Sequence, residues 1–177
     1  MIGDLDFDRF DFRPLVRADL MLLADWHAAP HVSRWWTTAA DLETEYLTGA
    51  DGTKRFVVQL DGRPTGLVQL YSLADSPEYA SLVGAEPGEV GIDYLLGDAA
   101  DVGRGVGPAM LAAFLEKFVT TNANVTGVRV DVAEANRRSW RTLEKLGFVR
   151  TLTGISVPGE PGPHYVYVLT DRRSFPA

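Results

Sequence analysis

The decisive stretch of sequence is Asp101–Pro108, DVGRGVGP, which lies between a predicted strand and a predicted helix. Gly103, Gly105 and Gly107 alternate with larger residues, so backbone N–H groups can converge there without a Cβ in the way of a ligand. The following helix contributes free N–H groups and the positive end of its dipole, and Pro108 suits a first helical turn. The stretch therefore predicts an anion site, with a diphosphate as its natural occupant, although a flexible turn would use similar residues.

Two familiar phosphate loops do not fit this stretch. A P-loop needs Gly-Lys followed by Ser or Thr, and the stretch contains no such run. A dinucleotide fold would place the turn after the first strand of its βαβ series, whereas several predicted strands and a hairpin precede it here. Nucleotide hydrolysis and hydride transfer are therefore disfavoured.

Apolar periodicity on both sides of this stretch predicts the other elements. Strands are expected at 10–15, 55–60, 66–71, 89–96, 128–132, 148–156 and 165–169, and helices at 19–26, 41–47, around 110–119 and at 137–146. Asp61-Gly62 predicts a hairpin, because glycine accepts the positive φ of a primed turn, and residues 73–88 are expected to form a polar loop. The order predicts a single α/β (α+β) domain over residues 1–177, with a mixed, mostly antiparallel central sheet flanked by helices.

Composition narrows the functional classes. With 177 residues, 46% of them hydrophobic, the chain can bury one domain core. The 24 acidic and 17 basic residues give a net charge of −7, which disfavours nucleic acid and would attract a cationic substrate, or only aid solubility. The sequence has no cysteine, no apolar run near the ~20 residues of a membrane span and no signal-like start. We therefore expect a cytoplasmic protein without disulfides, a thiolate nucleophile or a membrane partner.

Three pieces of sequence carry a family resemblance. Arg104–Gly107 (RGVG) after a strand, Asn136–Trp140 (NRRSW) and Leu143–Phe148 (LEKLGF) together resemble the acetyl-CoA signature of the GNAT superfamily of N-acetyltransferases. The resemblance implies that the glycine turn binds the pyrophosphate of acetyl-CoA and that Asn136 lies along the pantetheine arm, although Asn is also a preferred helix N-cap. The cofactor-binding residues that it implies are Tyr94, Leu95, Gly103, Arg104, Gly105, Val106, Gly107, Asn136, Trp140 and Lys145.

Shorter segments on the substrate side are similar to aminoglycoside 6′-N-acetyltransferases. They are 31–36 (HVSRWW), 66–71 (GLVQLY), 90–94 (VGIDY) and 130–132 (VDV). The similarity implies an acidic pocket for a cationic amine, the aminoglycoside, lined by Trp35, Trp36, Gln69, Tyr71, Asp93, Asp131 and Glu134. Of the two tryptophans, we expect one in the core and one in the pocket wall, because adjacent side chains face differently.

Asp93 and Asp131 are the expected catalytic residues. Asp93 lies within an apolar strand, on the face shared by Gly91 and Leu95, where an unpaired carboxylate is costly to bury. It therefore lines a cleft or, alternatively, points outward and pairs with an arginine. Asp131 ends a strand where cofactor and acceptor should meet, and the alternative for it is a solvated loop acid. His164 is expected in an exposed loop, and because the histidine spacing fits no metal motif, no metal is expected.

The residues suit direct acetyl transfer. The amine must be neutral and close to the thioester, and the tetrahedral intermediate must be stabilised. We expect Asp93 to accept the ammonium proton and backbone N–H groups of strand 89–96 to face the oxyanion. Many family members carry a tyrosine before Glu-Lys that protonates the leaving thiolate, and Leu143 takes that place here. The general acid is therefore left open.

Three functions fit the sequence. The leading one is an aminoglycoside 6′-N-acetyltransferase, an antibiotic resistance enzyme. The second is a siderophore-pathway N-acyltransferase that acts on a hydroxylated lysine. The third, which the departure at Leu143 supports, is a non-catalytic acyl-CoA-binding module. The physiological acceptor, the amine that is acetylated and the choice between monomer and homodimer stay open.

Overall fold

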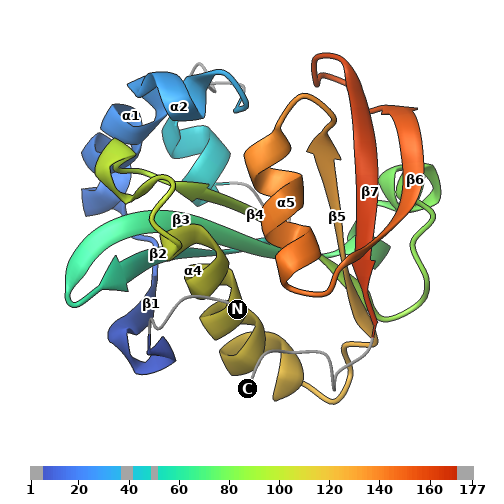
Figure 1. Ribbon diagram of the computed structural model, residues 1–177, viewed down its shortest axis with the longest axis horizontal. Coiled ribbons are helices and arrows are strands. Elements are labelled where there is room, and N and C mark those ends of the chain that lie inside the picture. The colour runs from blue at the N-terminus through green and yellow to red at the C-terminus, as the bar shows by residue number, and fades with distance from the viewer. Residues whose placement is uncertain (1–5, 37–41, 49–51, 171–177) are drawn as a thin grey trace.

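The computed structural model describes residues 6–36, 42–48 and 52–170, and in this part of the chain seven strands form one sheet (Figure 1). The strands are β1 (Phe10–Pro14), β2 (Lys54–Leu60), β3 (Arg63–Ser72), β4 (Glu89–Leu96), β5 (Gly127–Ala133), β6 (Val149–Ser156) and β7 (Pro163–Leu169). Their order in the sheet is β1-β2-β3-β4-β5-β7-β6. Neighbours are antiparallel except β4 and β5, which are parallel. The predicted mixed, mostly antiparallel sheet is confirmed.

Helices pack on both faces of this sheet. They are α1 (Leu20–Ala28), α2 (Pro30–Ser33), α3 (Pro77–Val83), α4 (Val106–Phe114) and α5 (Arg137–Lys145), with π-helical turns at Thr44–Thr48 and Leu115–Thr120 and 3₁₀ turns at Phe7–Arg9, Arg17–Asp19, Leu73–Asp75 and Ala99–Asp101. The helices predicted at 19–26, after the glycine turn and at 137–146 are confirmed, as is the described part of the one at 41–47. No helix within the described ranges is long and apolar enough to cross a membrane.

Residues 73–88 are not the irregular loop that the sequence predicted, because they include α3. Its end signals were present in the sequence. Pro77 occupies the first turn, and Gly84 ends the helix with a φ of 68°, a left-handed conformation that glycine tolerates. Val83 of α3 packs with Val166 and Val168 of β7. The helix therefore covers part of the sheet and brings its own side chains towards β5 and β7.

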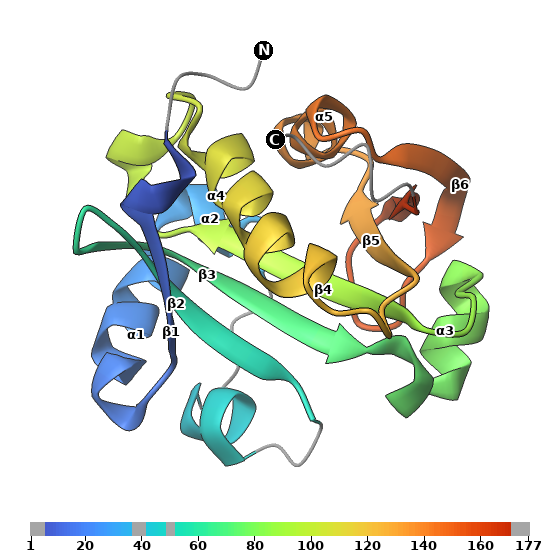
Figure 2. The same ribbon diagram turned by 90° about the horizontal axis from the view of Figure 1, so that it is seen from below.

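The β2–β3 hairpin shows how alternation in the sequence divides the core. Asp61 and Gly62 turn the chain with φ values of 52° and 77°, which confirms the predicted primed turn. Val57 packs with residues of α1, whereas Val58 packs with residues of α4, because neighbours in a strand point to opposite faces. Figure 2 shows α4 and α5 on one side of the sheet and α1 on the other. The sheet thus separates two hydrophobic layers.

The parallel strands β4 and β5 pair only where they begin, Glu89–Gly91 against Gly127–Arg129. A buried ion pair closes this end, because Arg129 Nε lies 2.7 Å from a Glu89 carboxylate oxygen and Arg129 also donates to the Val83 carbonyl. Beyond it the two strands diverge, and α5 follows β5 (Figure 1). Their divergence leaves a gap between the two strands in the ribbon (Figure 1). In the described chain, it leaves that side of β4 without a strand partner.

Candidate active site

The glycine turn opens a groove at the start of α4. Gly103 and Gly105 have φ values of 82° and 83°, which residues with a side chain rarely adopt. A Cβ built on either glycine would meet no atom within 4 Å, so the turn presents bare backbone to the space outside it. Gly105 is the N-cap of α4, and the next side chain, Val106, is buried in the core. The free N–H groups of the first turn of α4 therefore point into the groove.

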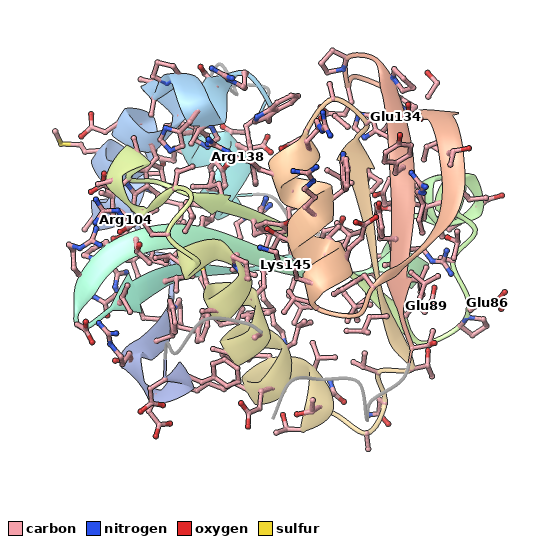
Figure 3. The ribbon with its side chains drawn as sticks, viewed as in Figure 1. Glu86, Glu89, Arg104, Glu134, Arg138 and Lys145 are labelled. Carbon is pink, nitrogen blue, oxygen red and sulfur yellow. The ribbon has the colours of Figure 1, made fainter. Side chains whose placement is uncertain are left out.

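Basic side chains line this groove. They are Arg34, Arg137, Arg138, Arg141 and Lys145. None of the described lining residues is acidic, although the whole chain carries a net charge of −7. Arg137, Arg141 and Lys145 recur every four residues, so they share one face of α5. Figure 3 shows Arg138 at the start of α5 and Lys145 at its end, with Glu134 beyond the opposite side of the helix. The groove is built for an anion with several charges.

Most of the predicted cofactor-binding residues line the groove. They are Tyr94, Leu95, Gly103, Gly105, Gly107, Asn136 and Lys145. Asn136 is also the N-cap of α5, as its residue type suggested. The other three predicted residues, Arg104, Val106 and Trp140, are not among those that line the groove, and their cofactor contacts stay predictions. Val106 is buried in the core, and Arg104 is exposed on the turn. Trp140 packs edge-to-face on Tyr165 and donates its N–H to the Glu134 carbonyl, away from the groove.

A second cleft, with a volume of about 850 Å³, lies between β4 and β5 and carries the opposite charge. Its acidic lining residues are Glu45, Asp93, Asp131, Glu134 and Glu160. Trp35, Trp36, Gln69 and Tyr71 line it as well, so all the residues predicted for the acceptor pocket meet in this cleft. Arg34 is the one arginine among the described residues of this cleft, and it also lines the basic groove. The two clefts therefore adjoin.

The expected division of the tryptophan pair holds only in part. Trp35 and Trp36 both line both clefts, so neither is simply a core residue. Trp36 also packs against the α1 side of the core, and its ring lies 5.7 Å from the His27 ring in an edge-to-face arrangement. Trp36 thus joins the core to the cleft wall.

Asp93 is the central acid of the second cleft. The Tyr71 hydroxyl donates to it at 3.4 Å, and Gln69 stands opposite it in the β3–β4 register. Tyr71 can take this position because Gly91 has no side chain, since a Cβ there would stand 2.2 Å from the Tyr71 ring. Burial, and then the charge of Asp131, raise the pKa of Asp93 to about 7. A carboxyl that titrates near neutral pH is suited to accept a proton from an ammonium group.

Asp131 is neither free nor a solvated loop acid. Tyr79 of α3 donates to one of its oxygens, and His164 Nδ1 lies 2.7 Å from the other. The expectation that His164 is exposed in a loop is wrong, because His164 belongs to β7 and only 5% of it is exposed. Its hydrogen bond to Asp131 raises the pKa of His164. The β5–β7 pairing brings this histidine to the cleft, a long-range contact that local sequence patterns do not reveal.

Leu143 does not face the groove. Leu143 belongs to α5, and its side chain is fully buried in the core together with residues of α4. A tyrosine at this position would overpack the core, so Leu143→Tyr would be a poor test of a missing proton donor. Any group that helps the thiolate to leave must come from another residue that reaches the junction of the clefts.

Sequence reasoning missed several residues of the site. Tyr79 was hidden because its helix was interpreted as a loop. Glu160 reaches the cleft from the connection between β6 and β7, and His164 reaches it from β7. The basic face of α5 could have been found, since its arginines and lysine recur at helical spacing. Among the described residues, no three histidines or acids gather in a way that could hold a metal ion.

The family model for the acetyltransferase (GNAT) domain matches residues 16–154, most of the chain. The chain belongs to the GNAT acetyltransferase family. Its activity is therefore N-acetyl transfer with acetyl-CoA as the donor, and the expected fold is confirmed.

Two of the similar proteins match nearly the whole chain, and a third matches about half of it. An aminoglycoside N(6′)-acetyltransferase type 1 from Klebsiella pneumoniae is 29% identical over 177 residues, 95% of this chain and 86% of that protein. The crystal structure of the aminoglycoside acetyltransferase AAC(6′)-Ib in complex with coenzyme A and kanamycin has a TM-score of 0.82 and 30% identity, and the match covers 94% of this chain and 96% of that one. A kanamycin resistance protein from Rhizobium radiobacter is 33% identical over 90 residues, 51% of this chain and 79% of that protein.

Proposed function

We propose that this chain transfers the acetyl group of acetyl-CoA directly to the 6′-amino group of an aminoglycoside. The observation that carries the proposal is a pair of oppositely charged clefts that adjoin where β4 and β5 diverge. The basic groove suits an anionic cofactor, and the acidic cleft suits a substrate with several ammonium groups. Relatives named as aminoglycoside N(6′)-acetyltransferases that match almost the full chain support the same acceptor.

The charge of the basic groove suits coenzyme A. The bare backbone of Gly103–Gly107 and the start of α4 would hold the pyrophosphate. Arg137, Arg141 and Lys145 would pair with the remaining phosphate charge. Asn136 lines the groove near the gap, where the pantetheine arm would pass. Bound acetyl-CoA supplies an activated acyl carbon with a thiolate leaving group.

Asp93 would take up the proton that the amine must lose before it attacks. Its pKa of about 7 allows it to be ionised in the resting site and to hold a proton during turnover. Asp131 assists because its charge contributes to that pKa. Backbone N–H groups of β4 beyond Gly91 would hydrogen-bond the carbonyl oxygen as it becomes negative. No covalent bond to the protein is needed.

The other acids of the cleft would bind the ammonium groups that do not react. Asp131, Glu134 and Glu160 lie around the same cleft as Asp93 and can pair with separate cations. A hydroxylated lysine carries fewer positive charges than the five acidic lining residues could pair, so it fits the cleft less well. That the protein is cytoplasmic, and that it is a monomer or a homodimer, are still predictions.

Two matched acceptors test the proposed function. The purified chain and acetyl-CoA are mixed with an aminoglycoside that has a 6′-amine, or with one that has a hydroxyl at that position, and free thiol is measured. Rapid thiol release is expected only with the 6′-amine. Equal rates would contradict the assigned position. Turnover of an N-hydroxylated lysine without turnover of any aminoglycoside would indicate the siderophore function, and cofactor binding without turnover of any amine would indicate a binding module.

A further inference from the structure

A pair of hydroxyls bridges β4 and α5 where the two clefts meet. The Tyr94 hydroxyl lies 2.7 Å from Ser139 Oγ and 3.3 Å from the Ser139 carbonyl oxygen. Tyr94 points to the α5 side of the sheet, opposite to Asp93, because neighbours in a strand alternate. Burial raises the pKa of Tyr94, so its hydroxyl stays neutral and able to donate at neutral pH.

The position of this pair matters because the acetyl group must pass from one cleft to the other. The residues that line both clefts are one arginine, one alanine, one asparagine, two tryptophans, Tyr94 and Ser139. Within this set from the described chain, only Tyr94 and Ser139 carry a hydroxyl. The Ser139 N–H donates to Asn136 Oδ1 at 3.2 Å, which fixes the serine in the first turn of α5. The hydroxyl pair is therefore anchored from both β4 and α5.

The hydroxyl pair can offer a hydrogen-bond donor to the leaving sulfur, which Leu143 cannot. Leu143 lies in the core and has no polar hydrogen to offer the departing sulfur. Ser139 is one helical turn closer to the start of α5, at the edge of both clefts. When Tyr94 donates its hydroxyl hydrogen to Ser139 Oγ, the hydrogen of Ser139 is left for a ligand in the clefts.

We propose that the Ser139 hydroxyl donates a hydrogen bond to the thioester sulfur as the C–S bond breaks, and that Tyr94 is the positioning residue that holds Ser139 for this. The inference rests on the proposed acetyl transfer. Asp93 has already taken one proton from the ammonium group; the neutral amine nitrogen then bonds to the carbonyl carbon, its second proton passes to solvent, and the C–S electron pair goes to sulfur. Ser139 keeps its own proton. Coenzyme A leaves as a thiolate and takes its proton from solvent.

The direct test measures the thiol pKa of coenzyme A bound to the protein. Thiolate formation is followed by ultraviolet absorbance as the pH rises, with the complex of desulfo-coenzyme A as the blank. In the wild-type complex this pKa should lie below that of free coenzyme A. Ser139→Ala should raise it by about one unit, the effect of losing one hydrogen bond to a charged group. Tyr94→Phe should raise it in the same direction.

Thr142→Val is the matched control for loss of a hydroxyl from α5. Thr142 lies one turn further along the helix, and its hydroxyl donates to the Arg138 carbonyl at 3.0 Å. The thiol pKa of bound coenzyme A should therefore stay at its wild-type value in this variant. Calorimetric titration of coenzyme A into every variant shows that each is folded and loaded.

Kinetics with an aminoglycoside give a second readout. Ser139→Ala and Tyr94→Phe should each lower kcat about tenfold with little change in the KM for acetyl-CoA, as expected for an interaction made only in the transition state. The double variant should be no slower than the slower single variant, because the two residues act as a unit. An identical thiol pKa in wild-type and Ser139→Ala complexes would overturn the inference. A lowered thiol pKa that depends on Ser139, in a protein that acetylates no aminoglycoside, would support the sulfur contact and contradict the proposed acceptor.

Discussion

Replacing Asp93 by asparagine should make the protein more stable and less active at the same time. The folded state raises the pKa of this carboxyl from 3.8 to about 7, first through burial and then through the charge of Asp131. Between these two values the folded protein binds more protons than the unfolded chain, so its stability falls as the pH rises. At about 1.4 kcal/mol per pKa unit, ionised Asp93 costs the folded state at most about 4 kcal/mol above pH 7.

Asparagine keeps the shape of the side chain and cannot ionise. Asp93→Asn should therefore match the wild type in free energy of unfolding near pH 4 and exceed it increasingly up to pH 8. Urea denaturation at several pH values measures this difference. The same substitution at Asp11, which is exposed on β1, is the control for removing a carboxylate far from the clefts. A difference between Asp93→Asn and wild type that does not grow with pH would refute the reasoning.

The same variant tests the role of Asp93 in catalysis. Loss of the proton acceptor should lower kcat about 10²-fold, the usual contribution of a general base. In the wild type, kcat/KM should rise with pH through about 7, because the ionised carboxylate is the active form. A variant with wild-type turnover would remove Asp93 from the mechanism.

Three further predictions follow from the two clefts. Gly107→Ala should weaken coenzyme A binding about tenfold by blocking one backbone hydrogen bond. It should also raise the melting temperature, because alanine favours a helix and its Cβ would meet only Leu96 Cδ1 at 3.7 Å. Gly105 is less suitable for this test, because its φ of 83° would strain any substitution. Unchanged affinity by calorimetry would contradict this. Asp131→Asn should mainly raise the KM for kanamycin in steady-state kinetics, since it removes binding that is uniform along the reaction, and a fall in kcat alone would count against it. Added salt should raise the KM for kanamycin more than that for a singly charged amine, and equal effects on both would speak against an acidic acceptor cleft.

The anion groove could be predicted from the sequence because its signals are local. Three glycines lie within five residues at the start of α4, and an asparagine N-cap begins α5, so the backbone conformation at each place follows from the local residue types. Asp93 was found for a similar reason, since a carboxylate inside an apolar strand is costly unless it lines a cleft.

The surroundings of Asp131 could not be predicted in the same way. Tyr79 precedes Asp131 by 52 positions and His164 follows it by 33, and both contacts depend on how α3 and β7 pack. Neither residue lies in a recognisable motif, so nothing in the local pattern shows that they meet. Likewise, Leu143 is buried because α5 packs on α4. The leucine that replaces the tyrosine of many family members is therefore a core residue, which the local pattern could not show. The positions of these residues depend on long-range packing, which the local spacing of residues in the sequence does not reveal.

The most direct test of the central claim is the identity of the product formed from kanamycin and acetyl-CoA. Purified wild-type protein is incubated with both, and the product is examined by mass spectrometry and by nuclear magnetic resonance of the sugar rings. The two oppositely charged clefts predict a single added acetyl group on the 6′-nitrogen, with one free thiol released for each. Unmodified kanamycin after prolonged incubation, with a protein that binds acetyl-CoA, would contradict the proposed function.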